Sequence, residues 1–132
     1  MTQEITQEQK ELLLKDLCTR LPYGVKCKYY DCCEGEYDEG TICGFERQEW
    51  IQIDGKCIYV EEVKPYLFPL SSMNEVQKNI YSIYINELKQ NTGIYFEKAL
   101  NSLQFWLYAN HFDVNNLIPM GLAINAVGLN IY

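Results

Sequence analysis

Six cysteines offer the most obvious chemistry in this sequence, and all of them lie in its first 57 positions, at Cys18, Cys27, Cys32, Cys33, Cys43 and Cys57. Structural zinc usually needs a close pair of cysteines, about two to four residues apart, because a short loop must span one edge of the tetrahedron. Here four residues separate Cys27 from Cys32, and Cys33 follows directly. A zinc site would therefore draw its ligands from several strands. The set that could supply them is Cys27, Cys32, Cys33 and Cys43.

Two other roles are open to these cysteines: disulfide bonds, and burial as free thiols. Residues 1–4 are polar, so we expect no signal peptide, and a chain of 132 residues can bury a core without covalent bridges. Free cysteine behaves as a small apolar residue. We therefore predict buried core positions for Cys18, Cys27, Cys43 and Cys57, with a small structural zinc-binding domain as the alternative.

His111 is the single histidine, so a cysteine or serine nucleophile that needed an imidazole base would have to use it. The residues that follow, Phe112 and Asp113, complete no nucleophile motif. The simpler interpretation is a histidine at a helix C-terminus, interacting with the last carbonyl groups. The chain also lacks a Gly-rich phosphate loop, a dinucleotide fingerprint and an HExxH helix. We expect no enzyme and no cofactor.

An acidic segment at residues 31–39 contains Asp31, Glu34, Glu36, Asp38 and Glu39 and no base. Carboxylates could bind Ca²⁺, but the segment lacks the spacing of a calcium-binding loop. An exposed acidic loop is therefore predicted. Near a later helix start, paired serines at 71–72 could hold a phosphate, although simple helix capping explains them better.

The overall composition excludes two classes of partner. Eighteen acids against eleven lysines and arginines give a net charge of −7, whereas affinity for nucleic acid requires clustered bases. No apolar run approaches the roughly 18 residues that span a bilayer. We expect neither a nucleic-acid nor a membrane partner, and a single domain over residues 1–132 in the cytoplasm.

Periodicity divides the first half of the chain into a helix and several strands. Thr6 and Gln9 form a capping box for a helix over residues 6–21, which a Leu-Pro-Tyr-Gly run then ends. Residues 24–60 contain four short strands, at 24–30, 41–45, 50–53 and 56–60. The last two flank Asp54-Gly55, the signal for a type I′ hairpin. This predicts a small curved antiparallel sheet or an SH3-like barrel of about four strands.

The second half of the chain predicts helices and an irregular tail. Residues 63–70 form an apolar, proline-punctuated connector, and Ser72 with Glu75 gives a second capping box. A helical pair is expected over residues 72–110, with Phe96, Leu103 and Phe105 among its inward positions. Residues 111–132 are expected to be ordered but irregular and to pack on the domain. The predicted class is α+β.

Aromatic residues make up 14% of the chain, more than one small core can enclose. Tyrosine at a surface is a favoured contact residue for partners and planar ligands. We therefore expect the sheet face and the acidic segment to form a binding surface. Its candidate residues are Tyr29, Tyr30, Tyr37, Arg47, Trp50 and Tyr59.

Four segments together resemble short hypothetical proteins of gut-bacterial phages and mobile elements. They are LPYGV at 21–25, VKPYLFPLSSM at 63–73, WL with HFD at 106–113, and LIPMGLA at 117–123. The resemblance covers nearly the whole chain and carries no established activity, cofactor or catalytic residue. It implies an accessory protein made inside a bacterial host cell.

Two functional classes follow from these features. The leading hypothesis is a non-enzymatic accessory protein that binds a host or phage protein, favoured by the acidic balance and the excess of tyrosine. The alternative is a protein that sequesters a small nucleotide signal and so counters host defence, with an aromatic ring stacked on the base. Such a pocket also needs lysine or arginine for phosphate, and few of these lie near the strands.

Overall fold

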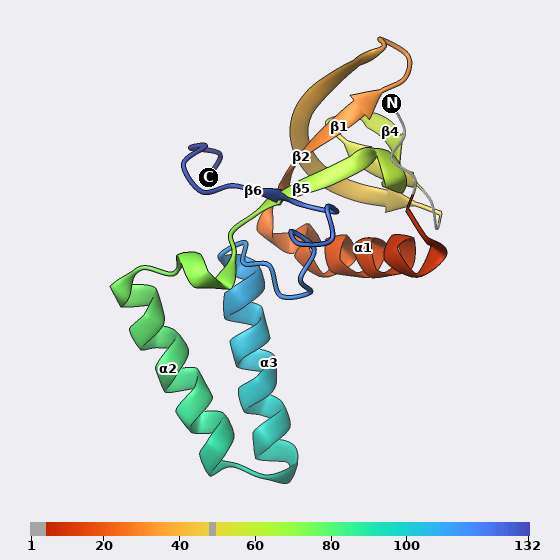
Figure 1. Ribbon diagram of the computed structural model, residues 1–132. Coiled ribbons are helices and arrows are strands. Elements are labelled where there is room, and N and C mark those ends of the chain that lie inside the picture. The colour runs from red at the N-terminus through yellow and green to blue at the C-terminus, as the bar shows by residue number, and fades with distance from the viewer. Residues whose placement is uncertain (1–4, 48–49) are drawn as a thin grey trace.

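The computed structural model describes residues 5–47 and 50–132. It contains an N-terminal helix, a curved six-stranded sheet and two further helices (Figure 1). The predicted α+β class is confirmed. The sheet is open, so the alternative of a closed SH3-like barrel is not realised. The polar residues 1–4, on which the prediction about a signal peptide rests, lie outside the described residues.

The first helix, α1 (Gln7–Arg20), begins at the predicted capping box. The Thr6 hydroxyl accepts a hydrogen bond from the Gln9 N–H at 3.1 Å, and the Gln9 side chain accepts one from the Thr6 N–H at 3.0 Å. Leu13 and Leu17 are buried in the core that α1 shares with the sheet. A 3-10 turn and then Gly24, at φ 66°, end the helix and lead into the first strand.

The sheet has the order β4-β3-β2-β1-β5-β6. The strands are β1 (Lys26–Asp31), β2 (Glu36–Glu46), β3 (Trp50–Ile53), β4 (Lys56–Tyr59), β5 (Val63–Leu67) and β6 (Ile124–Asn125). Neighbours from β4 to β5 are antiparallel, and β6 pairs with β5 in parallel. The tail strand thus covers the last two residues, Tyr66 and Leu67, of the edge that β5 would otherwise expose.

The β3–β4 hairpin turns at Asp54-Gly55, as predicted. Both residues have positive φ, 48° for Asp54 and 84° for Gly55, which is what a type I′ turn requires. The pairing Ile53↔Lys56 immediately before the turn sets the register. It brings Trp50 opposite Tyr59 at the other end of the hairpin.

The predicted acidic loop at 31–39 is wrong, and the strand predicted at 41–45 is present but begins five residues earlier. β2 begins at Glu36 and runs for eleven residues, and only residues 32–35 form a turn. The first four residues of β2 are exposed, because the β1–β2 hairpin extends beyond the core, as the top of Figure 1 shows. A strand with water on both sides lacks the alternation that marks a half-buried strand.

The connector predicted at 63–70 is in fact mostly sheet. β5 pairs with β1, with Pro65 opposite Cys27. Pro65 and its neighbours Tyr66 and Leu67 are buried. Proline is tolerated there because the ladder with β6 begins only at Tyr66.

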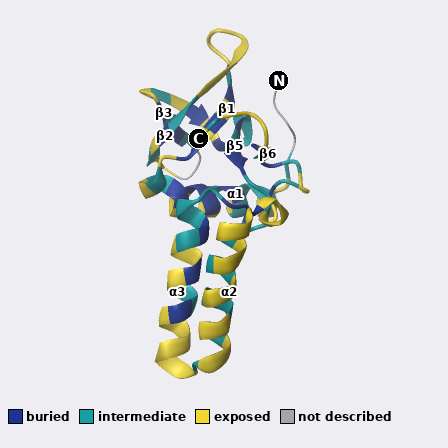
Figure 2. Cartoon of the chain, turned by 90° about the vertical axis from the view of Figure 1, so that its left-hand side faces the viewer, coloured by how far each residue is buried: buried dark blue, intermediate teal, exposed yellow. Residues whose placement is uncertain are grey.

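The helices α2 (Glu75–Gln90) and α3 (Gly93–Ala109) form an antiparallel hairpin that projects from the sheet (Figures 1 and 2). The capping box of α2 is Asn74 with Gln77, not Ser72 with Glu75. The Ser72 hydroxyl instead donates to the Pro69 carbonyl within a 3-10 turn, so the helix starts two residues later. Within the described part of the chain, no helix is long and apolar enough to cross a membrane.

Few side chains are buried between α2 and α3. On α3 the buried positions are Ala99, Leu103 and Leu107, and α2 has none. Phe96 and Phe105, which we expected to face inward, are 39% and 62% exposed. Two helices bury only one stripe each, and Phe105 lies outside that stripe, where its ring meets Tyr23 edge-on at 5.4 Å.

The tail at 111–132 is ordered and packs on the sheet, as predicted. Both carboxylate oxygens of Asp113 accept backbone N–H groups, from Leu117 at 2.8 Å and Ile118 at 2.9 Å. Phe68 and Phe112 form an isolated bridge beside β5. The tail therefore links the sheet to the base of the hairpin. That residues 1–132 form a single domain stays a prediction.

Candidate functional site

The predicted binding residues fall into three groups, and the alternation of strand side chains separates the first. Tyr29 points into the core and is 2% exposed, on the same side of β1 as the buried Cys27. It is a core residue, so its assignment to a binding surface is wrong. Tyr30, the next residue, points to the opposite side of the sheet.

We use the name β1–β2 outer face for the side chains that project from these two strands away from the core: Lys26, Lys28, Tyr30, Tyr37, Glu39 and Thr41. They are cross-strand partners in the pairs Tyr30↔Tyr37, Lys28↔Glu39 and Lys26↔Thr41. The two tyrosine rings meet edge-on, with centroids 5.2 Å apart. The Lys28 ammonium lies 5.1 Å from the centre of the Tyr37 ring. Tyr37 nevertheless remains 55% exposed, so it is held in place with half of its surface free.

The charge of this face opposes the net charge of the chain. Lys28 pairs with Lys64 of β5 in the β1–β5 register, and Lys26 stands two residues before Lys28 on the same side of β1. Three of the eleven bases thus gather on one patch of a protein with net charge −7. The acid within the patch, Glu39, accepts a hydrogen bond from the Tyr66 hydroxyl at 2.7 Å.

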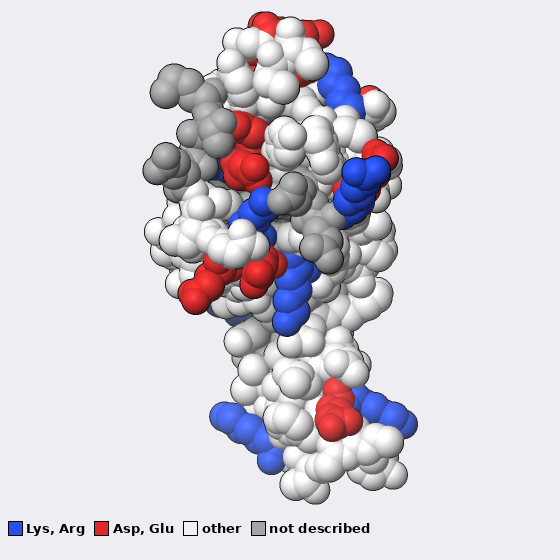
Figure 3. Space-filling view, turned by 90° about the vertical axis from the view of Figure 1, so that its right-hand side faces the viewer, with Lys and Arg blue, Asp and Glu red and all other residues white. Residues whose placement is uncertain are grey.

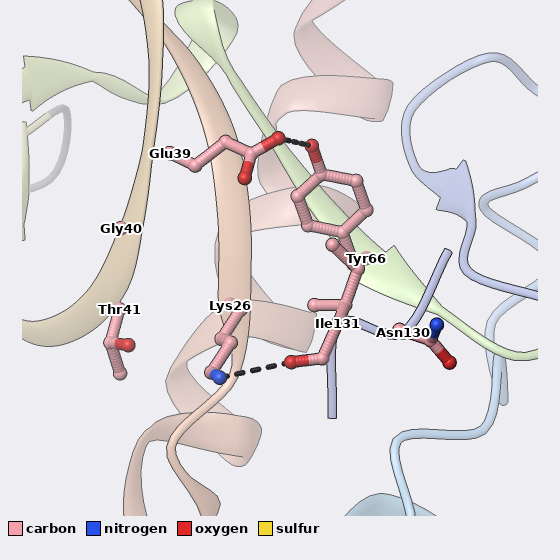
Figure 4. Close-up of a pocket in the computed structure, with 7 residues that line it drawn as sticks. All are labelled: Lys26, Glu39, Gly40, Thr41, Tyr66, Asn130 and Ile131. Carbon is pink, nitrogen blue, oxygen red and sulfur yellow. Dashed lines mark hydrogen bonds between the residues drawn. The ribbon is translucent and has the colours of Figure 1, made fainter.

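A cleft of about 310 Å³ ends this face where the C-terminal tail crosses it (Figure 4). Lys26, Glu39, Tyr66 and Ile131 line it, together with Gly40, Thr41 and Asn130. The Lys26 ammonium donates to the Ile131 carbonyl at 2.9 Å. Burial, followed by the hydrogen bond to Glu39, raises the pKa of Tyr66. The polar groups of the cleft are therefore largely engaged with the chain itself.

The C-terminal Tyr132 anchors the tail beside this cleft. Its hydroxyl accepts the Lys26 N–H at 2.9 Å and donates to the Tyr66 carbonyl at 2.9 Å. Its ring stacks on His111, with centroids 3.6 Å apart and planes 10° from parallel. Burial raises the pKa of Tyr132 to about 12. The sequence holds no local signal for these contacts, because Lys26 and Tyr132 are 106 residues apart.

The His111 ring has a packing role, because the Tyr132 ring stacks on it. Burial, with the nearby charges of Arg20 and Lys26, lowers its pKa to about 4, so the ring is neutral at pH 7. Its Nδ1 atom is buried without a hydrogen-bond partner among the described residues. The predicted contact between the His111 side chain and the last helix carbonyls is replaced by stacking on Tyr132. The contribution of His111 to the helix cap is its backbone N–H, which donates to the Tyr108 carbonyl.

The third group is a second aromatic pair on the β3–β4 hairpin. The Trp50 and Tyr59 rings lie 4.0 Å apart between centroids, with planes tilted by 32°. A cavity of about 270 Å³ beside them is lined by Trp50, Arg47, Glu46 and Cys57. The Cys57 thiol donates to a Glu46 carboxylate oxygen at 3.2 Å, which raises the pKa of Cys57. The structure thus brings predicted residues together in two places, Tyr30 with Tyr37, and Arg47 with Trp50 and Tyr59.

The four cysteines suggested as zinc ligands do not converge. Cys27 is buried and donates to the Gly40 carbonyl at 3.5 Å, and burial raises its pKa to about 12. Cys32 and Cys33 lie exposed in the β1–β2 turn, while Cys43 donates to the Gln52 carbonyl. In the described ranges 5–47 and 50–132, no three His, Cys, Asp or Glu side chains are grouped so as to hold a metal.

The prediction that four cysteines are core residues is confirmed for Cys27 alone. Cys18, Cys43 and Cys57 are exposed. Cys57 precedes the buried Ile58, so strand alternation directs it outward. Cys43 sits at the irregularity between Ile42 and Gly44, where the pairing with β3 shifts. Free thiols at such positions face solvent because the apolar neighbour occupies the core side.

Asp31, the first acid of the predicted acidic loop, holds the β1–β2 turn in place. Asp31 is buried, accepts the Cys33 N–H at 3.0 Å, and pairs with the Lys56 ammonium at 2.9 Å. The hydrogen bond from Lys56 is the main reason that the pKa of Asp31 is lowered. Asp31 therefore ties the β1–β2 turn to β4.

A scan against protein-family models, a search of curated proteins and a search of solved structures gave no match for this chain. The functional conclusion therefore depends on the geometry of the two aromatic groups.

Proposed function

We propose that this chain is a non-enzymatic accessory protein that binds another protein through its β1–β2 outer face. The observation that carries the proposal is the Tyr30–Tyr37 pair, whose exposed member is held edge-on by its neighbour on a paired strand. Tyrosine buries a large surface on binding and loses little conformational freedom, which is why it is enriched among binding hot spots.

The strands beneath this pair are paired without interruption. Six consecutive residue pairs join β1 to β2, and the ion pair of Asp31 with Lys56 ties the turn to β4. A partner that docks there does not have to order the strands, so less of the contact energy is spent on ordering. The extension of the hairpin beyond the core also leaves room for a partner on this side.

The lysines define the chemistry of the partner. Lys26, Lys28 and Lys64 make the face locally positive, so it suits a protein surface with carboxylates around an aromatic or aliphatic anchor. Opposite charge mainly raises the association rate and rejects wrong partners. The resemblance to phage and mobile-element proteins gives the setting for this proposal: a host or phage protein in the bacterial cytoplasm.

A second candidate function is binding of a nucleotide signal at the β3–β4 cavity. The observation that favours it is that Arg47 lines this cavity together with Trp50, whose ring packs on that of Tyr59, because a cation and an aromatic ring suit the phosphate and the base of a nucleotide. Glu46 on the same wall would repel an anion, so this candidate stands second. The zinc-binding alternative has no comparable support, because the described residues contain no group of three possible metal ligands.

The proposal is tested by capture from bacterial lysate with three proteins: the wild-type chain, Tyr37→Ser and the matched control Tyr59→Ser. Tyr59 is also a partly exposed strand tyrosine, at 41%, but it lies outside the outer face. We expect one protein to be retained by the wild type and the control and lost with Tyr37→Ser. If the captured protein is instead lost only with Tyr59→Ser, the binding site lies on the β3–β4 hairpin.

The second candidate has its own test, titration calorimetry with purified nucleotides. Binding that disappears in Arg47→Gln and persists in Tyr37→Ser would favour the nucleotide function. Absence of heat with every nucleotide would remove it and leave the protein-binding proposal untouched.

A further inference from the structure

The helical hairpin has an apolar stripe that its own packing leaves uncovered. On α2 the side facing α3 carries Tyr81, Ile85 and Leu88, which pack in the second hydrophobic cluster. A different side carries Val76, Ile80 and Ile83, spaced by four and three residues. Val76 is 67% exposed and Ile83 is 60% exposed. We call Val76, Ile80 and Ile83 the α2 seam.

Aromatic rings extend the α2 seam toward α3. Tyr84 lies between the two stripes of α2, and its ring centroid is 5.9 Å from that of Trp106 on α3. Both side chains are only partly buried. The remaining side of α2 is polar, with Lys78, Ser82 and Lys89 exposed. Helix α2 is therefore apolar on the seam side and polar on the opposite side.

The charges of the hairpin cancel. Residues 75–109 contain the acids Glu75, Glu87 and Glu97 and the bases Lys78, Lys89 and Lys98. The net charge of −7 therefore belongs to the rest of the chain. In Figure 3 the charged atoms gather over the sheet, and the hairpin below is mostly uncharged surface with a few lysines and acids.

We infer that a second copy of this chain covers the α2 seam and forms a symmetric dimer with a four-helix core. A two-fold interface must be complementary to itself, and a neutral surface with both signs of charge around an apolar centre meets that condition. A surface adapted to a strongly acidic or basic partner would carry a net charge of its own. Antiparallel helical hairpins also supply the two halves of a four-helix bundle.

The size of the hairpin fits a modest interface. Helices of 16 and 17 residues are about 25 Å long, and two side by side are about 20 Å wide, so each copy offers a footprint on the order of 500 Å². Two such footprints reach roughly the 1,000 Å² that a specific interface needs. The dimer therefore dissociates on dilution.

The sheet units decide the orientation of the dimer. Each carries a net negative charge, and they repel when they lie at the same end of the bundle. In an antiparallel arrangement, tip to base, about 25 Å of hairpin separates them, which exceeds the Debye length of about 8 to 10 Å at physiological salt. The second copy therefore binds antiparallel to the first.

The test is sedimentation equilibrium of the full chain over roughly 1 to 200 µM, where an interface of this size self-associates. We expect the wild type to approach twice the chain mass, Ile83→Lys to stay monomeric, and the matched control Ser82→Lys to behave as the wild type. Tyr37→Ser also stays dimeric, which separates this interface from the proposed binding face.

Two results would overturn the inference: a wild type that is monomeric at the highest concentration, or an Ile83→Lys variant that still dimerises. Ile83 and Val76 are mostly exposed, so replacing either leaves the core unchanged, and circular dichroism checks the fold. If Ile83→Lys proves unfolded, Val76→Ser takes its place, and a dimer as tight as the wild type's then contradicts the inference.

Discussion

Removing the guanidinium of Arg20 is expected to destabilise the protein more than any surface change. Arg20 and Asp16 are both fully buried, and the pair is bidentate, with Nε to Oδ2 at 2.6 Å and Nη2 to Oδ1 at 3.1 Å. Nη2 also donates to the Phe112 carbonyl at 2.7 Å, so the pair ties α1 to the start of the tail. The Tyr108 ring lies 4.8 Å from the guanidinium carbon.

The magnitude follows from what Arg20→Met leaves behind. The Asp16 carboxylate keeps one partner, the Asn115 amide at 2.7 Å, and its charge stays buried without a counter-ion. Breaking one side of a buried ion pair costs about 3 to 5 kcal/mol, and the orphaned Phe112 carbonyl adds about 1 kcal/mol. The total is a large part of the roughly 5 to 15 kcal/mol that stabilises a domain.

The assay is urea unfolding followed by circular dichroism, for Arg20→Met, Asp16→Leu and the double variant. Removing both charges leaves no buried ion, so the double variant is expected to be at least 2 kcal/mol more stable than the sum of the single losses predicts. A loss below about 1 kcal/mol in Arg20→Met would refute the reasoning, as would losses that simply add.

Three further perturbations have expected outcomes. The folded pKa of His111 is about 4, below its unfolded value, so the unfolded state binds the proton first and stability falls as the pH drops from about 6.5 to 4. After discounting for partial exposure, that loss is about 1 to 2 kcal/mol, and in urea unfolding at two pH values it should be absent from His111→Phe. Tyr132→Phe removes the hydroxyl that bridges Lys26 and Tyr66 and should cost about 1 to 2 kcal/mol, with faster amide exchange in the tail; unchanged exchange would count against the anchor. Gly55→Ala forces a side chain into φ 84° and should lower stability by about 1 to 2 kcal/mol, whereas a neutral result would contradict the type I′ turn.

Features with local causes could be predicted from the sequence. The capping box of Thr6 and Gln9 and the turn at Asp54-Gly55 need only neighbouring residues, and both are confirmed. The predicted start of α2 differs from the observed one because Ser72 and Asn74 both suit a cap, and in the structure Ser72 belongs to the Leu70–Ser72 3-10 turn instead. Local signals identify an element better than they identify its first residue.

Features that depend on distant contacts could not be predicted in the same way. The early part of β2 is acidic and exposed, and only its pairing with β1 makes it a strand. The two sides of β1 are an exception, because the alternation of Val25 and Cys27 with Lys26 and Lys28 already predicts that Tyr29 lies on the apolar side and Tyr30 on the charged side, and the burial of Tyr29 agrees. The contact of Tyr132 with Lys26 joins residues that are 106 positions apart.

Photo-crosslinking in living bacteria tests the proposed function most directly. A benzophenone amino acid replaces Tyr37 in one protein and Tyr59 in another, so that the crosslinker samples the β1–β2 outer face and the β3–β4 hairpin separately. We predict that position 37 crosslinks to one discrete protein and that position 59 does not. Lys28→Glu with Lys64→Glu should abolish the crosslink, because these lysines give the face its positive charge. Absence of any crosslink at position 37, or the same product at both positions, would contradict the proposed function.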